Sequence, residues 1–345
     1  MNHSQFFGNA REAGFRWGSA LLSRGVHIGG GGGFALSDAR RTFAAACRKS
    51  YREFFPEILA EAEGIAEGQK MAADNLACFL FSMYAFPMGA RCTCIALEKD
   101  GERTLGRNSD FLSSLADLYD SAHYVPDAGY AFVGNTTAFS EMEDGMNEKG
   151  LAAGLTFVCP RLRRPGFNAG ILVRYLLQKC ASVREGLAAL SSLPVASSQT
   201  IALADKDEIA VVECSPEKSV VLRPEEGFVL SVNDFSSPEM AAYKNPPDFD
   251  DWRASERYAF ARSALRKAVK GGDRGEMIAK RLLSAPMLCD YRGIPDADTV
   301  WSSVYLPASQ KIFRAEGNPS GTPFRPDTRL SVPGRDLTSA NLRTP

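Results

Sequence analysis

The chain has 345 residues, which is enough for one large domain or two ordinary domains with a substantial core. Its 40 basic and 41 acidic residues nearly cancel, and no block is rich in Lys or Arg, so a nucleic acid or anionic-membrane partner has no electrostatic support. The longest apolar stretches, such as "LACFLFSMYAF" from Leu76, are much shorter than the roughly 20 residues of a spanning helix. The N-terminus also lacks the pattern of a secretory signal. We therefore expect a soluble protein of the cytoplasm.

The eight cysteines and three histidines indicate no metal site. Only Cys92 and Cys94 lie close together, and this pair has no second cluster or paired histidines at the spacing of zinc ligands. His3, His27 and His123 are isolated and lie beside no motif, so a histidine-dependent catalytic triad has no support. We expect neither a metal nor an organic cofactor.

The first ninety residues or so have mostly helical patterns. Residues 37–69 show helical periodicity, with Ser37 or Asp38 as N-cap and Pro56 opening a second helix. The glycine run at 29–33 lacks the Lys-Ser/Thr and the preceding strand of a phosphate-binding loop, so we interpret it as an ordinary loop.

After Gly89 the pattern changes to short alternating runs that predict strands, such as "RCTCIAL", "RTLGRNSDF", "GLAAGLTFV", "TIALAD", "IAVVECS" and "FVLSVNDF". Helical patterns return at 169–193 and 253–272. Strands in groups with helices between the groups favour an α+β layered sandwich over an alternating parallel fold. The tail after about Glu316, rich in Pro, Gly, Arg and Thr, is expected to be an extended arm.

A predicted hairpin surrounds the first cysteine of the pair. With Asp100–Gly101 at the centre of a two-residue turn, residues whose numbers sum to 201 face each other, so Cys92 lies opposite Ser109. Arg107 is then the diagonal neighbour of Cys92 on the same face, and Asp110 lies one step beyond. A register error of one residue would turn Arg107 to the other face.

This geometry gives Cys92 two interpretations. A thiol beside a guanidinium has its thiolate favoured, and cleavage of the chain just before Cys92 would release an α-amine able to act as base on the same residue, with Asp110 orienting it. The alternative is an ordinary half-buried strand cysteine. Cys94 lies on the same face inside the strand and is expected to be structural.

The run "CTCIALEKDGERTLGRNSDF" resembles the start of the catalytic chain in cysteine N-terminal nucleophile hydrolases. These include the acyl-coenzyme A:isopenicillin N (6-aminopenicillanic acid) acyltransferase family and, more distantly, penicillin V acylases, bile salt hydrolases and N-acylethanolamine amidases. The fifteen residues from Cys92 to Arg107 are similar to the spacing in the acyltransferase branch. Further segments resemble that branch in order: "GNAREAGFRWG", "FFPEILAEAEGIAEG", "DGMNEKGLAAGLTF", "ADKDEIAVVECSP", "VLSVNDF", "SERY" and "TVWSSVYLPASQKIFRAEGNP".

The resemblance implies a four-layer αββα sandwich made as an inactive precursor and cut by itself between Arg91 and Cys92. Residues 1–91 would be a mostly helical pro-region, and residues 92–345 the catalytic domain, with both chains retained. In the family, the released N-terminal cysteine attacks an amide carbonyl, forms a thioester and passes the acyl group to water or to an amine.

The resemblance also implies residue roles. Cys92 would be nucleophile and, through its amine, base, while Arg107 would stabilise the thiolate and Asp110 would hold the amine. Asn233 would donate its side-chain amide to the oxyanion, and Arg257 would brace the site.

Two more residues are expected on the substrate or oxyanion side, Thr156 and Asn108. Thr156 stands where bile salt hydrolases carry an asparagine, so the oxyanion contact there could come from backbone N–H groups alone. Taken singly, each candidate also has an ordinary interpretation: Asn233 as a turn residue, Arg257 as a surface charge on a helix and Asp110 as the cap of a helix from residue 111.

We therefore expect a self-processing amidohydrolase or acyltransferase that acts on a small acyl amide or acyl thioester. The alternatives are a hydrolase of the penicillin V or bile salt type, and a non-catalytic binding descendant of the fold. The aromatic-rich segment 111–140 is expected to form loops that line an acyl pocket. The acyl group, its acceptor and the oligomeric state, a homo-oligomer included, stay open.

Overall fold

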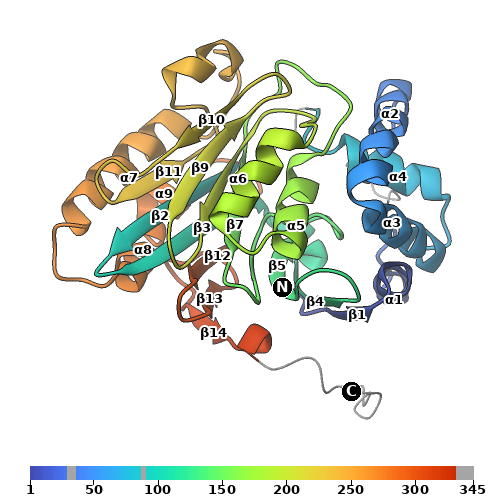
Figure 1. Ribbon diagram of the computed structural model, residues 1–345, viewed down its shortest axis with the longest axis horizontal. Coiled ribbons are helices and arrows are strands. Elements are labelled where there is room, and N and C mark those ends of the chain that lie inside the picture. The colour runs from blue at the N-terminus through green and yellow to red at the C-terminus, as the bar shows by residue number, and fades with distance from the viewer. Residues whose placement is uncertain (29–35, 87–90, 332–345) are drawn as a thin grey trace.

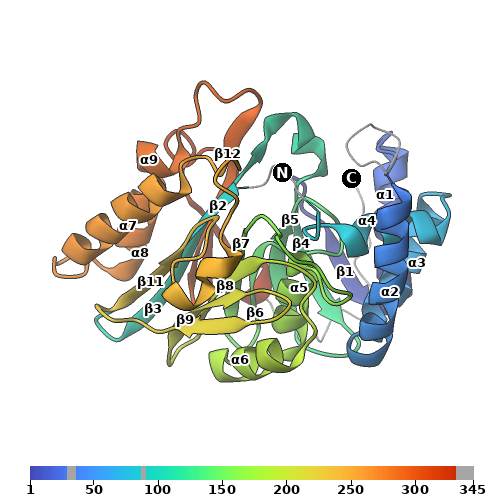
Figure 2. The ribbon, with the colours of Figure 1, turned by 90° about the horizontal axis from the view of Figure 1, so that it is seen from above.

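The computed structural model describes residues 1–28, 36–86 and 91–331, so the glycine run at 29–33 lies outside the described residues. Two β-sheets face each other, and helices cover both outer faces (Figure 1, Figure 2). The αββα sandwich expected from the sequence is therefore confirmed. In the described part of the chain, no helix has the length and apolar character needed to cross a membrane.

The first sheet, within the described ranges, has eight strands, and all neighbours are antiparallel except β1 and β4. Most of its strands are buried on both faces, because the second sheet covers one face and helices cover the other. In spatial order the strands are β1 (Gln5–Gly8), β4 (Asp120–Pro126), β5 (Phe132–Thr136), β6 (Asp144–Asn147), β7 (Ala152–Phe157), β8 (Gln199–Ala204), β9 (Ile209–Cys214) and β10 (Ser219–Leu222).

The second sheet has six antiparallel strands among the described residues, and it carries the predicted hairpin at its centre. Small and branched side chains, among them Cys94, Ala152, Ala202 and Val211, fill the space between the two sheets. In spatial order the strands are β11 (Phe228–Ser231), β2 (Arg91–Lys99), β3 (Glu102–Leu112), β12 (Ala297–Leu306), β13 (Lys311–Ala315) and β14 (Arg325–Asp327).

Two groups of helices form the outer layers (Figure 2). On the first sheet lie α5 (Ala169–Lys179) and α6 (Val183–Ser192), and on the second lie α7 (Ala254–Ala268), α8 (Gly275–Leu283) and the short α9 (Pro286–Cys289). Short 3-10 helices occur at η1 (Ser113–Leu118), η2 (Pro238–Tyr243) and η3 (Arg329–Ser331).

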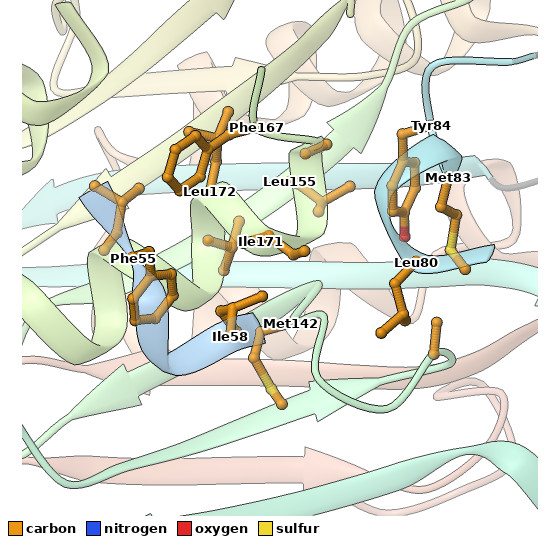
Figure 3. Close-up of a cluster of buried hydrophobic side chains, with 14 of the residues drawn as sticks. Phe55, Ile58, Leu80, Met83, Tyr84, Met142, Leu155, Phe167, Ile171 and Leu172 are labelled. Atoms are coloured by element: carbon orange, nitrogen blue, oxygen red, sulfur yellow. The ribbon is translucent and has the colours of Figure 1, made fainter. Parts of the chain in front are cut away.

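The N-terminal segment packs against one side of the sandwich (Figure 1). It contains α1 (Ala10–Ser23), α2 (Asp38–Phe54), α3 (Pro56–Gly68) and α4 (Ala73–Ser82). As predicted, the Ser37 side chain caps α2 and Pro56 opens α3. Figure 3 shows Phe55 and Ile58 beside Ile171 of α5, so the N-terminal helices and the first sheet share one hydrophobic core.

Glycines set the close crossing of α1 and α3. A Cβ on Gly14 would lie 2.1 Å from the carbonyl oxygen of Glu61, and one on Gly64 would lie 2.0 Å from that of Arg11. Gly18 and Gly68 face equally close backbone atoms one turn further along. No side chain fits at these four positions, which allows the two helix backbones to touch.

Two predictions from the sequence are wrong. Segment 111–140 is not a set of pocket loops, because it forms η1 and the buried strands β4 and β5 of the first sheet. The tail up to residue 331 is not a free arm, since β14 pairs with β13 and the carboxylate of Asp327 lies 2.9 Å from the guanidinium of Arg314. Strand pairing outweighs the loop-like composition of both segments, and in the tail an ion pair adds to it.

Candidate active site

The hairpin has the predicted register. Cys92 pairs with Ser109, so the side chain of Arg107 projects from the diagonal position on β3. Asp100 and Gly101 have φ angles of 51° and 79°, as a two-residue hairpin turn with two left-handed residues requires. The local sequence therefore fixes which side chains can meet at the start of β2.

The guanidinium of Arg107 lies fully buried between the two sheets and donates in four directions. Its Nη2 donates to Sγ of Cys92 at 2.7 Å and to Oε2 of Glu143 at 3.1 Å. Its Nη1 donates to Oδ2 of Asp144 at 3.3 Å, and its Nε to the carbonyl of Leu155 at 2.8 Å. One buried cation thus faces a thiol and two carboxylates.

Burial decides the protonation state of Cys92 in the uncut chain. The side chain is about fully enclosed, and this desolvation raises the pKa of the thiol to about 12. The Arg107 charge opposes the rise, as the sequence predicted, but the nearby Glu143 and Asp110 add to it. The thiol is therefore protonated at neutral pH while the chain is intact.

Two side chains hold the backbone of Cys92. The side-chain Oδ1 of Asn233 accepts a hydrogen bond from the backbone N–H of Cys92 at 2.8 Å. Nη1 of Arg257 donates to the backbone carbonyl of Cys92 at 2.8 Å. Nη2 of Arg257 also donates to Oδ1 of Asn233 at 2.8 Å, while Nδ2 of Asn233 donates to the carbonyl of Phe157 at 2.9 Å. These partners fix the amide orientation: Asn233 presents Oδ1 as an acceptor to Cys92, and one of its two amide N–H groups is bound to Phe157.

Asp110 lies in β3 directly across from Arg91, one residue from the expected contact with the Cys92 amine. Its carboxylate accepts hydrogen bonds from Tyr291 Oη and Thr299 Oγ1, each at 2.6 Å, and lies 4.0 Å from the Arg257 guanidinium. Burial raises its pKa to about 6, although all three neighbours lower it. Asp110 is a strand residue and not a helix cap.

Arg257 is no surface charge, because it is fully buried on the inner side of α7. The chain enters α7 through Trp252 and Arg253, whose φ angles are 52° and 60°. The bend brings the carbonyls of Asp251 and Trp252 to the guanidinium, which donates to them at 3.1 and 3.0 Å. The side chain is thereby locked in place against Cys92.

A sequence profile of the family described as acyl-coenzyme A:6-aminopenicillanic acid acyl-transferase matches residues 96–321, well over half of the chain. The chain belongs to this family. It is therefore an amide-cleaving or acyl-transferring enzyme of the N-terminal nucleophile class. The matched span begins four residues after Cys92 and contains Arg107, Asp110, Asn233 and Arg257.

Solved structures with a similar fold belong to two amide hydrolases. Penicillin V acylase from Agrobacterium tumefaciens has 20% sequence identity and a TM-score of 0.46, with 65% of this chain and 82% of that chain covered. A variant of conjugated bile acid hydrolase from Clostridium perfringens has 17% identity and a TM-score of 0.48, with 68% and 96% covered. No curated protein sequence gives a significant match. At this distance neither structure bears on the substrate of this acyltransferase-family chain.

The two residues expected on the substrate side have other partners within the fold. The hydroxyl of Thr156 donates to the carbonyl of Val232 at 2.6 Å, so it braces the segment that carries Asn233. Asn108 points away from Cys92 and donates to the carbonyls of Leu283 and Leu288 at 2.9 and 3.0 Å. Strand alternation puts Asn108 on the helix-covered face of the sheet, so the geometry gives no support to a contact with substrate.

Sequence reasoning missed the two carboxylates beside Arg107. The acidic run "EMED" at 141–144 leads into β6, whose first residue is Asp144, yet only the stacking of the two sheets brings Glu143 and Asp144 to the guanidinium. Glu143 also accepts hydrogen bonds from Ser109 Oγ at 3.0 Å and Thr137 Oγ1 at 2.6 Å. Burial raises the pKa of Asp144, although Arg107 opposes the rise.

The segment after α4 contributes a buried tyrosine next to this group. Tyr84 follows α4 with a φ angle of 58°, and 1% of the residue is exposed. Burial is the main cause that raises the pKa of its phenol. The charges of Glu143, Glu141 and Cys92 raise this pKa further, so the hydroxyl lies near these three side chains. Among the residues with described positions, no three His, Cys, Asp or Glu side chains are grouped so that they could hold a metal ion.

Proposed function

We propose that this family member is a self-processing enzyme in which Cys92 is the nucleophile for its own maturation and for an amide or thioester substrate. One observation carries the proposal: each polar atom of Cys92 has its own buried partner. Arg107 contacts Sγ, Asn233 contacts the amide nitrogen and Arg257 contacts the carbonyl oxygen. In an ordinary strand the backbone of a neighbouring strand would satisfy the amide and the carbonyl, and a core thiol needs no buried cation beside it.

The maturation step follows from this arrangement. Sγ of Cys92 attacks the carbonyl carbon of Arg91, the bond to the Cys92 nitrogen breaks, and the thiol proton moves to that nitrogen. The thioester that forms reacts with water, which leaves a carboxyl group on Arg91 and a free thiol and amine on Cys92. The intact chain would be a zymogen toward external substrates, because the thiol is enclosed and its nitrogen is an amide that cannot act as a base.

The released amine then acts as the base on the nucleophile. The α-amine of a peptide ordinarily has a pKa of about 7.7–8.0, so a sizeable share of it is neutral near neutral pH and can accept the thiol proton. Oδ1 of Asn233, which accepts the N–H in the intact chain, would hold the amine in the mature enzyme. The substrate forms an acyl thioester on Cys92, and water or an amine then takes the acyl group.

We also infer a reducing, cytoplasmic location. All eight cysteines are unpaired in the folded chain, which fits a compartment that keeps thiols reduced. Determining the thiol count by alkylation of protein isolated directly from cells under acid quench would test this location.

Intact mass under denaturing conditions tests the proposed function. The wild type should give two fragments that meet between Arg91 and Cys92, and Cys92→Ala should stay a single chain. Cys94→Ala is the matched control, because it removes a buried thiol from the same face of the same strand and should still be cut. Processing of Cys92→Ala at the same bond would refute the nucleophile.

A further inference from the structure

The side chain of Arg91, the residue before the nucleophile, is enclosed in a cage. Its guanidinium carbon lies 4.6 Å from the ring centre of Phe249 and 5.5 Å from that of Trp252, and Nη2 donates to the carbonyl of Asp250. Burial lowers the pKa of the guanidinium, and the nearby Arg257 adds to this, whereas the charges of Asp250 and Asp251 favour its cationic form; 4% of Arg91 is exposed. We call residues 249–252 the Arg91 cage.

The cage is a rigid part of the active site. Its Trp252 holds a left-handed backbone, which is uncommon for an aromatic residue and persists only where the surroundings impose it. The N–H of Trp252 donates to Oδ1 of Asp250 at 3.1 Å, and its ring packs 5.0 Å from that of Tyr291, the partner of Asp110. Arg257 binds the cage carbonyls and the Cys92 carbonyl with one guanidinium.

The reaction itself relates the cage to the substrate. In maturation, Arg91 supplies the carbonyl that Sγ of Cys92 attacks, so Arg91 is the first acyl group to form a thioester on the enzyme. A substrate acyl group forms the same bond to the same sulfur. The side chain of that acyl group can therefore occupy the space that the side chain of Arg91 occupies in the intact chain.

Cleavage weakens the hold on Arg91. The cut removes the covalent link between Arg91 and the rest of β2. It leaves a carboxylate on Arg91, whose strand position is directly opposite Asp110, a buried carboxyl. Two carboxylates on facing strand residues repel each other strongly when they are buried and not screened by water. The cage, whose residues all belong to the large chain, then becomes accessible to another group.

Resting on the proposed function, we propose that the Arg91 cage is the acyl-side subsite of the mature enzyme and that it selects acyl groups carrying a guanidinium or ammonium cation. Two aromatic faces, two carboxylates and a carbonyl oxygen recognise such a cation. A neutral acyl chain of equal length would leave the carbonyl and the carboxylates without a charged partner. In the first step the Cys92 thiol reacts with the amide acyl–NHR and gives the acyl thioester and the amine RNH2. In the second step water reacts with the thioester and gives the acid and the free thiol.

Three acyl amides of 7-amino-4-methylcoumarin test the selection: Nα-acetyl-arginyl, Nα-acetyl-citrullinyl and Nα-acetyl-norleucyl. Citrulline has the shape of arginine without the charge. We expect kcat/KM for the arginyl amide to exceed that for the citrullinyl amide by about tenfold or more. Phe249→Leu and Asp250→Asn should each reduce this ratio severalfold, whereas Asp207→Asn, in the exposed turn between β8 and β9, should leave it unchanged.

Maturation gives a second readout that needs no external substrate. Arg91→Lys keeps a cation in the cage and should be cut at nearly the wild-type rate, whereas Arg91→Gln should be cut about tenfold more slowly or worse. Thermal unfolding of each variant shows whether the fold is retained.

Each outcome has one meaning. The cation subsite is overturned if the three amides are turned over equally. It is also overturned if the processed enzyme cleaves none of them and Arg91→Lys and Arg91→Gln are processed at equal rates. Both results leave the proposed function intact. A wild-type chain that stays uncut and forms no acyl thioester at Cys92 overturns the proposed function and the subsite together.

Discussion

Arg107 donates a hydrogen bond to Sγ of Cys92 across 2.7 Å, from the diagonal position on the neighbouring strand. The same guanidinium binds Glu143 and Asp144, so the cation beside the thiol is more than neutralised by two anions. The pair therefore positions the thiol in the intact chain without ionising it. Under the proposed function, this arrangement holds the thiol in place for attack on the adjacent Arg91 carbonyl, while its burial keeps it from an external substrate.

Replacing Arg107 should stop processing and destabilise the fold. In Arg107→Ala, Glu143 and Asp144 lose their buried partner, which typically costs about 3–5 kcal/mol of folding free energy. Arg107→Lys keeps the charge but loses the fork that reaches four acceptors, so processing should be slowed by about two orders of magnitude. The measurements are an intact-mass time course and urea unfolding.

Arg103→Ala is the control, since Arg103 lies on the same strand in a partly exposed pair with Glu98. Its loss should change stability by less than about 1 kcal/mol. Normal processing of Arg107→Lys would show that a point charge suffices and that the fork geometry has no role.

Substitutions of two buried asparagines should have different effects, one mainly on the processing rate and the other mainly on stability. Asn233→Ala removes the acceptor for the Cys92 N–H and a partner of Arg257, so processing should fall by about two orders of magnitude, as when a positioned hydrogen-bonding group is lost. Asn108→Ala removes one hydrogen bond to the end of α8 and one to α9, and it should cost about 1–3 kcal/mol of stability while processing stays within a few-fold. A rate loss in Asn108→Ala equal to that in Asn233→Ala would contradict this division.

Asp110 should make stability fall as the pH rises. Its pKa is about 6 in the folded chain and 3.8 as an ordinary carboxyl, so its protonated form stabilises the fold below about pH 4, and this contribution is lost as the pH rises through about 6. The loss amounts to about 3 kcal/mol for a fully buried group, and Asp110→Asn should remove it.

The test is urea unfolding of Cys92→Ala, with and without Asp110→Asn, between about pH 4 and about pH 7. The Cys92→Ala background keeps both proteins uncut. Asp144 and Glu141 also have raised pKa values from burial, so only the difference between the two pH profiles reports on Asp110. Parallel profiles would mean that Asp110 titrates like an exposed carboxyl.

Local sequence predicts the nucleophile hairpin well. The Asp100–Gly101 turn fixes the register, and strand alternation then brings Arg107 to Cys92 without any information from the rest of the chain. The order of strands and helices likewise predicts the layered sandwich, and Ser37 predicts the start of α2.

Contacts between distant elements were beyond sequence reasoning. Glu143 reaches Arg107 only because one sheet packs on the other, and no local pattern reports that packing. The amide of Asn233 is oriented by a carbonyl of β7, a contact that no local pattern reports, and its role toward an oxyanion stays a prediction. Gly14 and Gly18 in α1, like Gly64 and Gly68 in α3, have a G-x-x-x-G spacing. This spacing could have indicated a close helix crossing.

A buried ion pair should keep the two chains together after cleavage. Nη2 of Arg174 in α5 lies 2.9 Å from Oε2 of Glu61 in α3, and Tyr124 Oη donates to Oε1 of Glu61 at 2.9 Å. Both charged side chains are about fully buried. Glu61→Ala leaves Arg174 without its partner, at a cost of about 3–5 kcal/mol, so the small chain should dissociate from the processed enzyme. Size-exclusion chromatography of processed protein would show the loss of the small fragment.

Glu67→Ala is the matched control, because Glu67 pairs with Arg11 at the exposed end of α3 and its loss should leave the two chains associated. Replacing both partners, as in Glu61→Leu with Arg174→Met, removes the charges together and should restore association, since a buried pair is often no more stabilising than a well-packed apolar one. If Glu61→Ala keeps the chains together as firmly as Glu67→Ala, the shared hydrophobic core between α3 and α5 is sufficient for retention, and the ion pair serves only to align the helices.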